Sequence, residues 1–174
     1  MEPSGSAVGG QLAWRLTSGR GFRSHEYELV DEEGISRATA TVSGSGLLSK
    51  LSVGGRELTI RQRPLAAGFD VLDRTSGVLV AEENWRKMTI QIRNRPLLIG
   101  VFSKAAPPWW GWQALWSTSE GSLAMTLNWI ANPMLSFSSW TRARVAICDR
   151  DLENDGYLAA CLVTANRTPR QFIA

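Results

Sequence analysis

Residues 156–165 read Gly-Tyr-Leu-Ala-Ala-Cys-Leu-Val-Thr-Ala, a nearly continuous apolar stretch close to the end of the chain. Alanine favours helix over strand, either Asp151 or Asp155 can cap the N-terminus, and the run 166–169 (Asn-Arg-Thr-Pro) is a typical stop signal. These features predict a helix over about 152–166, although a buried strand is the alternative for so short an apolar run. A helix that is apolar on all sides has to be enclosed on all sides.

The rest of the chain alternates between apolar and polar residues, as β-strands do, with turn residues at regular intervals. We expect short strands over 11–17, 25–31, 35–42, 47–53, 57–63, 69–73, 78–81, 88–93, 97–102, 113–117, 122–129 and 143–148. Many short, evenly spaced strands indicate a sandwich or barrel, and only a sheet that curves around the helix can enclose it. The sequence therefore predicts a mainly β fold, an antiparallel barrel of about 10–12 strands that encloses a hydrophobic C-terminal helix.

Length and composition predict one soluble domain. The chain has 174 residues, of which 44% are hydrophobic and 20% charged, as in ordinary globular proteins. We expect residues 1–10 to form a flexible leader and residues 11–174 a single domain. No apolar run is long enough for a transmembrane helix, and the N-terminus does not resemble a signal peptide, so we expect a cytoplasmic protein.

A weak internal repeat links hairpins that are far apart in the sequence. Tyr27-x-Leu29-x-Asp31 with Gly34 resembles Phe69-x-Val71-x-Asp73 with Gly77, and Leu115-x-Ser117 with Gly121 is a candidate third copy. In each copy an Asp or its counterpart opens the turn, and a glycine allows a positive φ. The alternative is that any β-hairpin has this pattern.

The hairpin Phe69-x-Val71-x-Asp73-x-x-x-Gly77 and the tail 149–165 together resemble the tubby C-terminal-like superfamily, which includes tubby, the plant LURP-one-related proteins and the phospholipid scramblases. The resemblance covers the chain from about Leu12 to its end. It implies a closed antiparallel barrel threaded by a hydrophobic C-terminal helix. It also implies phosphoinositide binding through basic surface side chains, as in tubby itself.

No motif indicates an enzyme. The chain has no Gly-x-Ser-x-Gly elbow, no phosphate-binding loop and no dinucleotide fingerprint, and its one histidine, His25, has polar neighbours. Cys148 and Cys161 lack the spacing of a metal site, and we expect both to be buried thiols. We expect a non-catalytic protein with no metal and no cofactor.

Arginines spaced by two are the first candidate binding feature. The pairs lie in or beside expected strands, where a two-residue period places both members on one face; they are Arg61 with Arg63, Arg93 with Arg95, and Arg142 with Arg144. If their strands were neighbours, six guanidinium groups would form a patch suited to phosphate headgroups. The alternative is that these are ordinary solvated positions, made arginine by codon bias.

The second candidate is the aromatic loop 107–112, which reads Pro-Pro-Trp-Trp-Gly-Trp. Tryptophan favours the membrane–water boundary, and Trp109 and Trp110 lie in the Pro-rich part, where exposure is most expected. Closure of the barrel by some of these rings is the alternative.

From these features we expect a binding module for anionic phospholipid headgroups or a membrane surface, located in the cytoplasm and peripheral at the membrane. The alternative is a protein-interaction or scaffold domain with no lipid role. The net charge of +3 is too small to favour nucleic acid as a partner.

Overall fold

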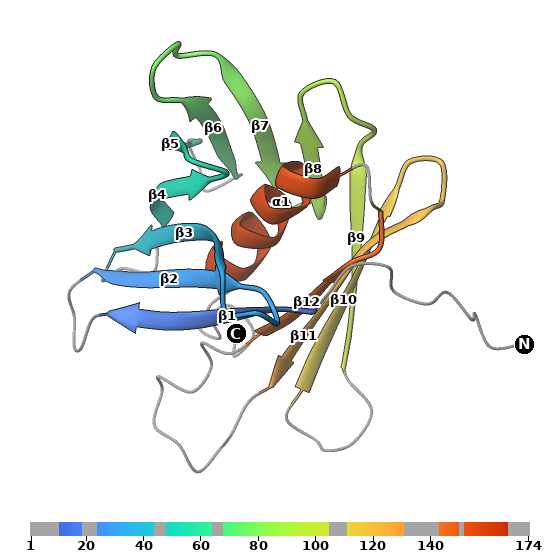
Figure 1. Cartoon of the computed structure of the whole chain (residues 1–174). Helices are drawn as coiled ribbons and strands as arrows, with labels where there is room; N and C mark the ends of the chain where they lie inside the picture. The colour runs from blue at the N-terminus through green and yellow to red at the C-terminus, as the bar shows by residue number, and fades with distance from the viewer. Residues whose placement is uncertain are drawn as a thin grey trace, which may run out of the picture.

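A computed structural model describes residues 11–18, 24–43, 48–63, 68–104, 111–130, 143–149 and 152–166. The leader 1–10 lies outside these residues. The architecture is a closed antiparallel barrel of twelve strands, in which each strand pairs with its sequence neighbours and β1 pairs with β12 (Figure 1). The strands are β1 (Gln11–Ser18), β2 (His25–Val30), β3 (Ser36–Val42), β4 (Leu48–Val53), β5 (Arg56–Gln62), β6 (Phe69–Asp73), β7 (Leu79–Asn84), β8 (Thr89–Ile92), β9 (Leu98–Lys104), β10 (Gly111–Thr118), β11 (Leu123–Ile130) and β12 (Ala143–Ile147).

The helix α1 (Glu153–Asn166) lies inside the ring of strands (Figure 1). Six consecutive residues, 158–163, are each at most 3% exposed. Because six residues cover more than one turn of 3.6 residues, every face of the helix is covered. Both the predicted helix and the predicted barrel around it are confirmed.

The buried polar side chain of the enclosed helix has its hydrogen-bond partner within the same helix. The hydroxyl of the buried Thr164 donates to the carbonyl of Ala160 at 2.7 Å, so it has a partner inside the apolar core. Asp155 is not the N-cap, because the helix begins at Glu153 and Asp155 lies within its first turn. Asp151 lies outside the described residues.

Strand direction gives the barrel two distinct ends. Odd-numbered strands end, and even-numbered strands begin, at what we call the loop end; the opposite end is the turn end. Since β12 runs toward the turn end, α1 enters the barrel there and its C-terminus points to the loop end. Two contacts agree with this: Gly54, in the β4–β5 turn, approaches Asn154, and Gly156 approaches the side chain of Ile147.

Three hairpins at the turn end share one design. The first two are the predicted copies at β2–β3 and β6–β7, where Asp31 and Asp73 accept backbone N–H groups of their own turns. In the third, at β10–β11, Thr118 takes the place of aspartate: its hydroxyl accepts the N–H of Ser122 at 3.2 Å. The three hairpins lie four strands apart around the barrel.

The third copy is shifted by one residue from the frame expected from Leu115 and Ser117. The structural equivalents of Tyr27 and Leu29 are Ala114 and Trp116, which are fully buried, whereas Leu115 points outward and is 39% exposed. The sequence pattern missed this frame because alanine and tryptophan do not resemble the apolar residues of the other copies. Trp116 fits opposite Gly100, where even a Cβ atom would lie 2.8 Å from the indole ring.

Candidate functional site

Five of the six arginines proposed as a headgroup site are described, three of them in or beside strands and two in a turn, and they do not share one patch. Their strands, β5, β8 and β12, are not neighbours in the sheet. Arg61, Arg63 and Arg144 lie toward the loop end, whereas Arg93 and Arg95 lie in the β8–β9 turn at the turn end. Arg142, Trp109 and Trp110 lie outside the described residues.

Arg61 and Arg63 form an ion-pair ladder with the next two strands. Arg61 donates to Asp70 at 2.9 Å, and Arg63 donates to Asp70 at 2.7 Å and to Glu82 at 2.9 Å. The pKa of Arg63 is raised, chiefly by its hydrogen bond to Asp70. Burial favours the neutral form of Asp70, but the bonds from Arg61 and Arg63 outweigh it and lower the pKa of this carboxyl.

The ladder leaves Arg61 able to bind a further group. Its side chain is 67% exposed, and only one terminal nitrogen donates to Asp70. A guanidinium has five N–H donors, so most of its donors still face solvent. Arg63 is 28% exposed and is held on both sides by carboxylates, so its role is to position the ladder.

Arg93 and Arg95 do not share a strand face, because β8 ends at Ile92 and both residues lie in the following turn. Between them lies Asn94, which has a φ of 61°, so the extended strand geometry that would align the two side chains is absent at this point of the chain. Arg93 is exposed. Arg95 donates to Asp155 at 2.7 Å and so ties the first turn of α1 to the barrel wall. Arg95 therefore contributes to the placement of the helix.

Carboxylates gather at the turn end. They lie in the turns and in the approach to α1, namely Asp31, Glu32, Glu33, Glu57, Asp73, Glu120, Asp149, Glu153 and Asp155. Arginines neutralise several of them: Arg37 lies 2.7 Å from Asp31, and Arg74 pairs with Glu57. Acidic residues still outnumber basic ones among the described residues of this end.

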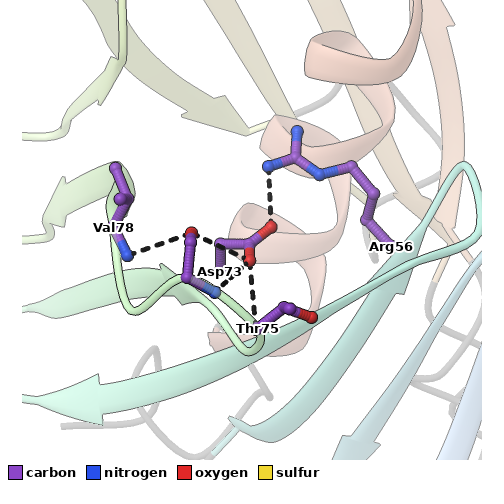
Figure 2. Close-up of polar contacts among 5 residues, drawn as sticks. Arg56, Asp73, Thr75 and Val78 are labelled. Atoms are coloured by element: carbon purple, nitrogen blue, oxygen red, sulfur yellow. Dashed lines mark hydrogen bonds and ion pairs between the residues drawn. The ribbon is translucent and has the colours of Figure 1, made fainter.

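Asp73 shows how these carboxylates are held (Figure 2). One oxygen accepts the backbone N–H groups of Thr75 at 3.0 Å and Ser76 at 2.9 Å, and the other accepts from Arg56 at 2.9 Å. Hydrogen bonds lower the pKa of Asp73 to about 2; the largest effect comes from the Ser76 N–H and the next largest from Arg56. Arg37, Arg56 and Arg74 are thus each paired with a carboxylate in or beside a turn of this end.

Basic side chains prevail toward the loop end. The β7–β8 turn carries Trp85, Arg86 and Lys87; Arg86 and Lys87 are exposed and Trp85 is partly exposed. Arg144, near the start of β12, is also exposed. Within the described residues, neither Lys87 nor Arg144 has a carboxylate at ion-pair distance. Sequence patterning does not mark this turn, because it lies as a plain connection between two predicted strands, 78–81 and 88–93.

The described residues contain no group of three His, Cys, Asp or Glu side chains placed to hold a metal ion. Nor do they include a helix with the length and apolar character needed to cross a bilayer.

Comparisons with family models, curated proteins and solved structures found no match to this chain.

Proposed function

We propose that this protein is a non-catalytic binding module that meets an anionic membrane surface with its loop end. One observation carries the proposal: exposed cations such as Arg61, Lys87 and Arg144 lie toward the loop end, while the described carboxylates concentrate at the turn end. The molecule is therefore polarised along the barrel axis. An anionic surface attracts the loop end and repels the turn end, which orients the approach.

The proposed contact combines charge with an interfacial aromatic ring. Trp85 lies beside Arg86 and Lys87, and tryptophan prefers the headgroup region of a bilayer. Trp109 and Trp110 belong to the sequence between β9 and β10, whose flanking residues, Lys104 and Gly111, both lie at the loop end. These two rings remain part of the proposal as predicted contacts, and so does Arg142, between β11 and β12.

The fold supports the proposal through the resemblance to the tubby-like superfamily. A closed antiparallel barrel around a hydrophobic C-terminal helix is the architecture which that resemblance implies. Because the helix fills the interior, ligand contact belongs on the outside or at the ends of the barrel. We place the protein in the cytoplasm, peripheral at the membrane, with phospholipid headgroups as the partner.

Vesicle co-sedimentation tests the proposal. We expect the full chain to bind vesicles that contain phosphatidylserine or a phosphoinositide, and to bind them less as salt rises, because surface charges are screened. Each basic residue close to an anionic surface strengthens membrane binding by about fivefold. The triple variant Arg61→Ala/Lys87→Ala/Arg144→Ala should therefore lose binding by roughly a hundredfold.

Arg74→Ala is the matched control. Its side chain is 64% exposed, close to the 67% of Arg61, and both arginines pair with a carboxylate of a neighbouring strand, but Arg74 lies at the turn end. We expect Arg74→Ala to bind vesicles as the wild type does. Equal binding to neutral and anionic vesicles, or an equal loss in Arg61→Ala and Arg74→Ala, would show that the proposal is wrong.

A further inference from the structure

On one side of the barrel wall the described outward-facing side chains carry no charge. On β8 to β11, every outward-facing side chain that the structure describes is uncharged. The outward side chains of β4 to β7, by contrast, include Lys50, Glu57, Arg61, Asp70 and Glu82. We call the outer surface of β8–β11 the uncharged face.

The centre of the uncharged face is apolar and contiguous. It consists of Ile99, Val101, Leu115 and Leu123, which are 41%, 64%, 39% and 44% exposed. Leu115 is paired with Val101 across β9 and β10, while Ser117 is paired with both Ile99 and Leu123. The four side chains therefore lie close together on the three neighbouring strands β9, β10 and β11. Contiguous exposed apolar residues of this kind mark contact surfaces.

Polar but uncharged side chains border this apolar centre. Gln91 on β8, Gln113 on β10, and Thr126 and Asn128 on β11 are all partly exposed. An apolar centre with a hydrogen-bonding rim is the usual composition of a protein–protein interface. The described side chains of β8–β11 provide no cationic rim, although the exposed Arg144 of the neighbouring strand β12 is paired with Asn128 at the border.

The closed barrel restricts how a partner can attach. Among the described residues every strand already pairs on both sides, so these strands offer no free edge to an added strand. A partner must meet the wall face to face.

We infer that the uncharged face is the interface of a homodimer, with a second copy of this chain as its occupant. In a two-fold symmetric dimer the same surface meets itself, so any charge at its centre would be brought close to an identical charge. The uncharged face avoids this repulsion, because its described side chains hold no ionisable group. It is thus electrostatically self-complementary, whereas the charged wall of β4–β7 is not. This inference does not depend on the proposed membrane contact, which lies at the loop end.

Sedimentation or light scattering of the full chain tests the dimer. We expect a mass of twice that of the chain at a protein concentration on the order of 100 µM. On dilution the dimer should dissociate and the mass should fall toward that of a single chain. Val101→Arg and Leu115→Arg each place a charge at the centre of the face, and should raise the dissociation constant by at least about tenfold. Both side chains point to solvent, so thermal unfolding should confirm that the variants fold.

Ile35→Arg is the control, because Ile35 is 48% exposed and precedes β3, which lies opposite β9 in the twelve-strand ring. It should leave the dissociation constant within about twofold of the wild type. A chain that is monomeric throughout the concentration range overturns the inference, as does a dimer equally weakened by Ile35→Arg. Loss of vesicle binding in Val101→Arg with no change in mass would instead make this face a lipid contact, and the homodimer would be rejected. The triple loop-end variant should still dimerise, which separates this result from the membrane proposal.

Discussion

Asp73 shows what a single carboxylate contributes at the turn end of this barrel. Its two oxygens have separate partners, since one closes the β6–β7 turn and the other receives Arg56 from β5 (Figure 2). Asp31 repeats the arrangement with the Ile35 N–H and Arg37. Each aspartate thus joins a tight turn to a neighbouring strand position, which fixes the register of that hairpin.

Asp73→Asn tests this role through its pH dependence. The folded pKa of about 2 is below the ordinary value of 3.8, so the carboxylate stabilises the native state above about pH 4 and this contribution is lost as pH falls toward 2. Urea unfolding should therefore show Asp73→Asn less stable than the wild type at pH 7, with the difference shrinking toward zero near pH 2. A difference that stays constant from pH 7 to pH 2 would contradict this account. Asp31 and Asp70 also titrate in acid, but they are common to both proteins and cancel in the comparison.

At the scale of elements, the approach of α1 to β12 depends on a residue without a side chain. A Cβ atom added at Gly156 would lie 2.8 Å from Cδ1 of Ile147 and 3.1 Å from its Cγ2. Glycine weakens a helix by roughly 1 kcal/mol relative to alanine. The sequence carries it here because the helix must pass close to the wall.

Gly156→Ala should accordingly fail to give the usual stabilisation. We expect this variant to lose about 1–3 kcal/mol of unfolding free energy through overpacking. Adding Ile147→Val, which removes Cδ1, should recover part of that loss, so the two changes are non-additive in a double-mutant cycle. A gain of about 1 kcal/mol in Gly156→Ala alone would mean that the contact is easily relieved and does not control the placement of the helix.

At the scale of the whole molecule, the helix and the barrel are one cooperative unit. Residues 158–163 of the helix are almost fully buried, and they form one core cluster with the buried side chains of the barrel among the described residues. Neither part can keep its apolar side chains from water without the other. Opening of the barrel should therefore be the event that exposes the helix.

Thiol labelling measures that opening. Cys161 is fully buried, and burial raises the pKa of its thiol far above the ordinary value, whereas Cys148 is only partly buried. In the variant Cys148→Ala, we expect a thiol reagent to label Cys161 only at the rate of global unfolding. Cys161→Ala should leave a thiol, Cys148, that reacts in the native state. Fast labelling of Cys161 under native conditions would show that the helix leaves the barrel on its own.

The strands and the helix were predictable because they depend on periodicity along the chain. Alternation located all twelve strands to within a few residues at each end, and the all-round apolar character of 156–165 required an enclosure. The binding residues were less predictable. The spacing of Arg93 and Arg95 suggested one strand face, but the chain turns between them, and Arg95 serves α1, sixty residues away.

The set of elements, the barrel class and the enclosed helix all follow from the amino-acid sequence, since each depends on the local order of apolar and polar residues. Which charges share an end of the barrel, and which described side of the wall is uncharged, depend instead on how the strands are arranged in space. Strand direction and ring closure bring Arg61, Lys87 and Arg144 toward one end, and place β8–β11 side by side. Such proximity is a property of chain reversal and sheet closure, which no single segment encodes.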